Sequence, residues 1–180
     1  MKFTAKRLCL AAVFMALNVV LSSFGVPVPG GKIYLNGIII CFASLFLDPF
    51  SAFAVGGVGA YLGDLFFYPA PRYVSLIVRG VQAVAISLIS GGYKRNKPEI
   101  LRAIIAVCVG AIISVCGYTF GKYFYVGTNW WGYATAKLPF QIMQDVVCPA
   151  VSVALLYLTP LKKYAFKSVS ANASADPEAK

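Results

Sequence analysis

Three ionisable residues lie inside long apolar stretches of this sequence, where a charge is costly to bury. They are Asp64, Arg79 and Asp145. Ionisable groups in such surroundings usually mark a ligand site, a proton path or a structural ion pair. Amide side chains also occur in the apolar stretches of the sequence, among them Asn36, Gln82, Gln141 and Gln144. The spacing of Gln141, Gln144 and Asp145 (i, i+3, i+4) predicts that they occupy one face of a helix.

The residue types near these groups limit the catalysis they could perform. The sequence contains no histidine, which excludes Ser-His-Asp and Cys-His catalysis and the commonest metal ligand. Its five cysteines form no CxxC pair and lie in apolar stretches, as small buried hydrophobic residues do. Asp64 and Asp145 could serve as the acid/base pair of a membrane-embedded enzyme. We nevertheless expect a binding protein rather than an enzyme, with no cofactor and no metal of its own.

The composition favours a membrane protein. Of the 180 residues, 59% are hydrophobic and 12% are charged, whereas soluble domains average about 45–50% and about 25%. Six apolar stretches are separated by Pro/Gly-rich or charged segments, which end helices. They are residues 8–24, 33–47, 50–68, 73–90, 100–120 and 140–158. Every backbone amide in a bilayer needs an internal partner, so we predict an all-α membrane protein with six transmembrane helices.

Lysine and arginine are distributed unevenly between the two sets of loops. The formal net charge is +10, with 16 basic and 6 acidic residues, on a chain too apolar for nucleic-acid binding. If the N-terminus is inside, ten basic residues lie on the inner side and four on the outer side, namely Lys32, Arg72, Lys122 and Lys137. The positive-inside rule then places both termini in the cytoplasm. We expect one domain in the cell membrane (residues 1–167) and a disordered cytoplasmic tail (168–180). A cleaved signal peptide is the alternative interpretation of residues 8–24.

This topology places the strongest polar groups at one level. Asp64 lies near the outer end of its predicted helix, and Arg79 and Asp145 lie in the outer halves of theirs. Together with the four amides they predict a cup that opens to the outside and could hold a small ligand. The alternative is structural, with Arg79 paired to Asp64 or Asp145 and the amides connecting helices. Two carboxylates beside one buried arginine, with Lys32 and Arg72 at the rim, leave the cup near neutral, which favours a neutral or zwitterionic heteroaromatic ligand.

An aromatic segment follows the fifth apolar stretch. We predict that residues 121–139 form a long outer loop that carries Trp130 and Trp131. As a lid, these rings would stack on a flat ligand. The alternative is a belt of aromatic residues at the membrane interface.

Small residues recur at helical spacing in several stretches. Ala12 and Ala16 belong to such a stripe in residues 8–24, and Gly56 and Ala60 belong to another in residues 50–68. These stripes allow close helix contact, either within the bundle or with a separate subunit. The sequence has no P-loop (G-x-x-x-x-G-K-[ST]) and no detectable inverted repeat. A binding cup without an energy source suggests one subunit of a larger transporter.

An ordered set of segments resembles the substrate-binding (S) components of energy-coupling factor (ECF) vitamin transporters. Residues 26–36 (VPVPGGKIYLN) resemble the family's first outer loop as it enters a short second span. Residues 45–49, residues 56–64 and residues 77–80 resemble its L-x-G-P, GG-x-G…D and (I/V)-(K/R)-G motifs, with Asp48 where the family often has Gly. Ala12-x-x-x-Ala16 matches the family's alanine motif. The riboflavin/hydroxymethylpyrimidine/pyridoxine-like branch is the most similar.

The resemblance implies a six-helix S-component bundle and a mechanism of uptake. The protein would capture a vitamin from outside, dock through Ala12 and Ala16 onto a transmembrane coupling (T) component, and release the vitamin inside. Two cytoplasmic ATPases would use ATP to drive this cycle. We expect a B6-type or pyrimidine vitamer, with riboflavin second, and a stand-alone passive carrier is the alternative. The expected substrate-binding residues are Asn36, Asp64, Arg79, Gln82, Trp130, Trp131, Gln141, Gln144 and Asp145.

Overall fold

The computed structural model describes residues 5–29, 31–91 and 100–158 and is mostly helical. The first part of the chain forms α1 (Ala5–Ser23), an antiparallel hairpin of β1 (Gly25–Val28) and β2 (Gly31–Tyr34), and the short helix α2 (Asn36–Ser44). A continuous helix follows, built from α3 (Pro49–Phe53), the π-helical turn η1 (Ala54–Val58) and α4 (Gly59–Phe67). The remaining elements are α5 (Arg72–Ser90), α6 (Ile100–Val126), the 3₁₀ turn η2 (Gly127–Asn129) and α7 (Trp130–Leu158).

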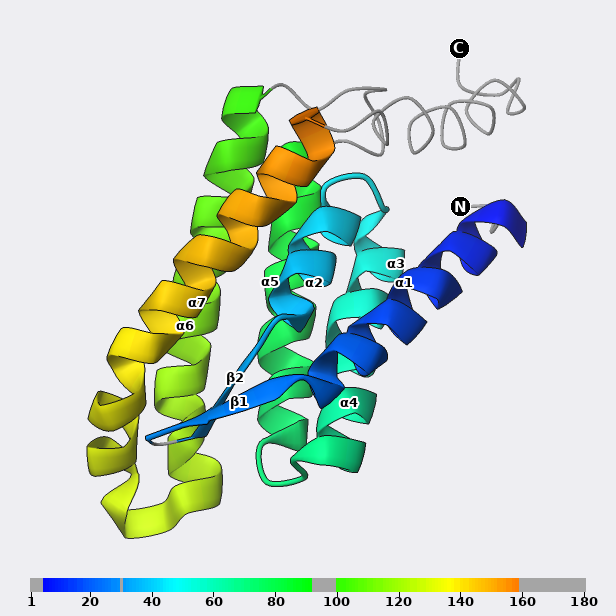
Figure 1. Cartoon of the computed structure of the whole chain (residues 1–180). Helices are drawn as coiled ribbons and strands as arrows, with labels where there is room; N and C mark the ends of the chain where they lie inside the picture. Colours follow the sequence, from blue (N-terminus) through cyan, green and yellow to red (C-terminus); the bar gives the residue numbers. More distant parts are fainter. Residues whose placement is uncertain (1–4, 30, 92–99, 159–180) are drawn as a thin grey trace.

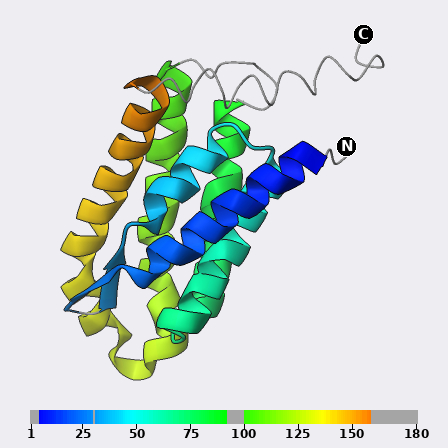
Figure 2. The same ribbon diagram turned by 45° about the vertical axis from the view of Figure 1, so that its right-hand side comes forward.

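The helices form a bundle whose two ends differ (Figure 1). One end carries the β1–β2 hairpin, the α4–α5 connection and the α6–α7 connection, and we call it the hairpin end. The start of α1 and the end of α7 lie at the opposite end, and the rotated view in Figure 2 agrees. Within the bundle α5 packs against α6, and α6 packs against α7.

Local chemistry explains where the helix after α2 begins. Asp48 stands at the N-cap, where its carboxylate accepts hydrogen bonds from Ser51 N at 3.1 Å and Ser51 Oγ at 2.9 Å. Pro49 occupies the first helical position, where a missing N–H has no cost. The break predicted between the second and third apolar stretches is therefore confirmed.

Four of the predicted spans correspond to helices long and apolar enough to cross a membrane. These helices are Pro49–Phe67, Arg72–Ser90, Ile100–Phe124 and Gly127–Leu158. The first apolar stretch forms a shorter apolar helix, Leu8–Ser23. The predicted tail, residues 168–180, lies outside the described residues. By length and composition, the four longer helices could each cross a membrane.

The prediction of a full second span over residues 33–47 is wrong. Residues 33 and 34 belong to β2, and α2 has only nine residues. At 1.5 Å per residue, a helix of this length reaches about 14 Å, less than half of the hydrocarbon thickness. Its apolar residues instead contact other helices, because most of α2 is buried.

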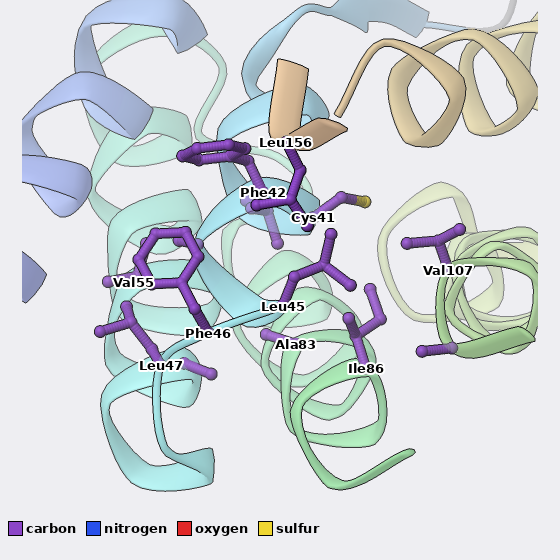
Figure 3. Packing of buried hydrophobic residues seen from close by; sticks show 14 of the residues in the cluster. Cys41, Phe42, Leu45, Phe46, Leu47, Val55, Ala83, Ile86, Val107 and Leu156 are labelled. Atoms are coloured by element: carbon purple, nitrogen blue, oxygen red, sulfur yellow. The ribbon is translucent and has the colours of Figure 1, made fainter. Parts of the chain in front are cut away.

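The apolar core surrounds α2 and the turn after it. Ile40, Leu45 and Phe46 are fully buried there against Val55 and Ile86 (Figure 3). The Phe46 ring also contacts Phe14 of α1 and Phe42 of α2, with centroid separations of 5.5 and 5.2 Å. This core holds α1, α2 and α5 in fixed relative positions, and those helices carry part of the polar network described below.

Most of the small-residue stripes are used for packing within the bundle. A Cβ added at Gly56 would lie 2.7 Å from Ala83 Cβ and 2.9 Å from Arg79 O, so η1 approaches α5 closely. At Gly110 an added Cβ would lie 2.6 Å from Ile86 Cδ1, so α6 also approaches α5 closely at a glycine. Ala12 and Ala16 differ, because both are exposed on α1.

Candidate functional site

Arg79 is the centre of a buried polar network that connects three helices. Its Nη1 donates hydrogen bonds to Gln82 Oε1 at 2.9 Å and to Ser114 Oγ at 3.3 Å. The same nitrogen lies 3.6 Å from Asp145 Oδ1 of α7. Gln141 Nε2 donates to the other carboxylate oxygen of Asp145 at 2.6 Å. The structure therefore brings these four predicted residues together, with Arg79 paired to Asp145.

Two hydroxyl groups extend the network on α5 and α6. The Ser75 hydroxyl accepts a hydrogen bond of 2.9 Å from Tyr118 OH. The guanidinium of Arg79 lies over the Tyr118 ring, 5.1 Å from its centroid. Asp64 is also buried, but among the described residues no hydrogen bond or ion pair joins it to Arg79. The contacts of Tyr118 with Ser75 and with Arg79 both involve α6, a helix that the sequence did not indicate as part of the site.

Gln144 connects the network to the hairpin. Its Oε1 accepts a hydrogen bond of 3.2 Å from the backbone N–H of Tyr34 in β2. Cys148, one turn further along α7, lies with its Sγ 4.0 Å from the Tyr34 carbonyl oxygen. The network therefore lies in the half of the bundle toward the hairpin end and takes in residues from α5, α6 and α7.

Asn36 belongs to a second, smaller network. Its Nδ2 donates to Ser22 Oγ of α1 at 2.9 Å. Ser22 Oγ in turn donates to the backbone carbonyl of Asn18 at 2.9 Å. Asn18 Nδ2 donates to the Val55 carbonyl at 2.6 Å. Both amide oxygens, Asn18 Oδ1 and Asn36 Oδ1, are buried without a hydrogen-bond partner in the described part of the chain. Asn18 is an amide within the first apolar stretch, a signal that could have indicated this contact.

The prediction of a loop over residues 121–139 is wrong. Helix α6 continues to Val126, only the turn η2 intervenes, and α7 begins at Trp130. Gly121 is helical, and a Cβ there would collide with the Val74 side chain, so this glycine serves helix packing rather than a turn. The turn occurs at Gly127, whose φ of 76° favours glycine.

The two tryptophans lie in the first turn of α7 instead of a loop. Trp130 packs edge-on against Tyr123, with centroids 6.2 Å apart, and against Trp131, with centroids 5.1 Å apart. Trp131 is 60% exposed, whereas Trp130 is half-buried.

This correction also changes the charge of the site. Lys122 and Lys137, expected in an outer loop, are buried between the helices at 2% and 8% exposure. Lys122 Nζ donates to the Tyr133 carbonyl at 3.3 Å, and Lys137 Nζ lies 5.7 Å from the centroid of the Tyr118 ring. The expectation of a near-neutral cup counted neither of them.

A groove between α6 and α7 reaches the network from the side. Its volume is about 410 Å³, and Asp145 is the one predicted site residue that lines it. The other lining residues are mainly apolar and include Ile104, Ala111 and Pro149. Asp145 is only 4% exposed, so the groove borders the network without opening it to the surface.

Comparisons with known proteins give a family match and a curated relative. Residues 2–163 match the family described as "ECF-type riboflavin transporter, S component". The chain is 28% identical over 123 residues to an uncharacterised protein encoded in the gap 3′ region of Pyrococcus woesei, with 67% of this chain and 78% of that protein covered.

A solved structure has the same fold. It is described as the S component of a bacterial ECF transporter, and it superposes with a TM-score of 0.64. The superposition covers 88% of this chain and 96% of that one, at 20% sequence identity.

Proposed function

This chain belongs to the family of ECF-type riboflavin transporter S components, and from that premise we propose that it captures a small heteroaromatic vitamin outside the cell. The transporter family and the apolar helices make it a multi-pass membrane protein and a component of a transporter. A B6-type or pyrimidine vitamer and riboflavin are the ligands we propose.

The observation that carries this proposal is the buried polar network around Arg79. Arg79, Gln82, Gln141, Gln144 and Asp145 are each at least nine-tenths buried in an otherwise apolar bundle. Burying this many polar groups is costly unless they are paired. A small set of polar groups in an apolar surrounding is typical of a ligand site, where a bound ligand replaces some of the internal contacts. The donors and acceptors of Arg79, Gln82 and Asp145 suit the ring nitrogens, carbonyls and hydroxyls of a heteroaromatic vitamin.

We further propose the partners and the orientation that the family implies. The exposed pair Ala12 and Ala16 would dock onto a T component, and two cytoplasmic ATPases would supply energy from ATP. The protein itself would need no cofactor. The described ends of the chain lie together at one end of the bundle (Figure 1), which agrees with our proposal that both termini face the cytoplasm.

The experiment that tests this function is identification of the bound ligand. The protein, purified in a maltoside detergent, is extracted and its small molecules are identified by mass spectrometry. Riboflavin, pyridoxine and hydroxymethylpyrimidine are then titrated, each with its phosphorylated form, while the thermal midpoint is followed. Absence of any bound or stabilising compound would contradict the proposal. Accumulation of substrate by this chain alone would instead support a passive carrier, and turnover would support an enzyme.

The start of α7 provides a prediction about ligand release. We propose that Trp130 covers the site, and we expect Trp130→Ala to increase the off-rate of the bound vitamin about five- to tenfold, since one aromatic contact contributes about 1 kcal/mol. Stopped-flow fluorescence measures this rate. Trp131→Ala is the matched variant, and its effect should be smaller because Trp131 is more exposed. Unchanged rates in both variants would leave these residues as an interfacial belt.

A further inference from the structure

Three cationic side chains from three helices gather around one aromatic ring. Arg79 of α5 and Lys137 of α7 both lie over Tyr118 of α6, at 5.1 and 5.7 Å from its centroid. Lys122 lies one turn beyond Tyr118 on α6, toward the hairpin end, and its Nζ contacts the carbonyl of Tyr133, one turn before Lys137 on α7. All three cations are buried.

The three cations differ in how they are compensated. Arg79 has Asp145 at 3.6 Å, and Lys122 donates to the Tyr133 carbonyl. In the part of the chain that the structure describes, the Lys137 ammonium has no hydrogen-bond acceptor and no carboxylate within 4 Å, and its contact is the face of Tyr118. A ring face compensates an ammonium less than a carboxylate does.

The charges around Lys137 do not balance. The three cations share this part of the bundle with two buried carboxylates, those of Asp64 and Asp145. Three cations against two carboxylates leave one positive charge in excess. An unpaired buried charge is destabilising, so its presence is explained if a further anion binds beside it.

We propose that Lys137, flanked by Lys122 and Arg79, binds an oxyanion, either a phosphate or a carboxylate group. That this oxyanion is part of the transported vitamin rests on the proposed function, whereas the anion site itself does not. The excess charge reverses the expectation of a neutral or zwitterionic ligand, because that expectation placed Lys122 and Lys137 in an outer loop.

Inorganic phosphate is the probe that tests the site without any vitamin. We expect phosphate, titrated to about tenfold above its Kd in maltoside detergent, to raise the thermal midpoint by about 3 °C or more over chloride at equal ionic strength. Lys137→Met should abolish most of this shift and should itself be more stable than the wild type in chloride, because it removes the unpaired charge. Lys137→Arg should retain the shift.

Lys32→Met is the matched control for a general loss of positive charge. Lys32 lies at the hairpin end, but its Nζ donates to the Phe67 carbonyl at 3.2 Å and lies over Tyr68, so this variant should keep the full phosphate shift. A wild-type protein that phosphate does not stabilise, or a Lys137→Met variant with the full shift, would overturn the proposal.

The vitamin titrations separate this inference from the proposed function. Each phosphorylated vitamin that binds should bind at least about tenfold more tightly than its neutral parent, and equal or weaker binding would exclude the anion from substrate recognition. A phosphate shift without binding of any vitamin would overturn the proposed function and leave the anion site. Vitamin binding without a phosphate shift would overturn the anion site and leave the proposed function.

Discussion

Removal of either charge of the Arg79–Asp145 pair is expected to destabilise the protein by about 3–5 kcal/mol and to abolish ligand binding. Both side chains are buried, and they lie 3.6 Å apart. Arg79→Ala leaves the Asp145 carboxylate with only Gln141, and Asp145→Ala leaves the guanidinium with a neutral amide and a hydroxyl. A buried charge that loses the partner of its ion pair carries this cost. Thermal unfolding and ligand titration measure the two effects.

The double variant Arg79→Met/Asp145→Leu distinguishes a structural role from a binding role. It removes both charges and keeps apolar volume, so its stability should exceed that of either single variant. Ligand binding should stay absent, because the donors and acceptor that we assign to the vitamin are gone. Binding by the double variant at wild-type affinity would show that the pair only holds helices α5 and α7 together.

Substitution of Ala12 or Ala16 by tryptophan is expected to reduce vitamin uptake in cells by more than tenfold while the affinity for the vitamin stays within about twofold. Both alanines are exposed and lie one turn apart on α1, where small side chains permit a second helix to approach closely. Neither residue contributes to the network around Arg79. Uptake of radiolabelled vitamin, together with co-purification of the T component and ATPases, measures the effect.

Leu17→Trp provides the matched control for an added indole on α1. Leu17 is also exposed, but it lies about 140° around the helix from Ala12 and is already large. Uptake should therefore be retained in this variant. Equal losses in Leu17→Trp and Ala12→Trp would show that bulk on α1 disturbs the protein itself, and loss of vitamin affinity in Ala12→Trp would contradict the docking assignment.

Two of the helices could be predicted to within one residue because their limits depend on local chemistry. The predicted span 50–68 matches the helix Pro49–Phe67, which starts at the Asp48 cap. The span 73–90 matches α5, which ends at Gly91 in the left-handed conformation. Where local signals were ambiguous the prediction failed. Gly121 is typical of a turn by residue type, yet it packs against Val74 inside α6.

The apolar composition, the helical stretches and the presence of polar groups within them follow from the amino-acid sequence, since each depends only on neighbouring residues and on the cost of burying a charge. Three features depend on how the helices pack against one another. These are the burial of α2 within the bundle, the pairing of Arg79 with Asp145 rather than Asp64, and the position of Lys137 beside Tyr118. Each joins residues that are far apart in the chain, and the periodicity of one stretch does not specify which face of another helix it meets.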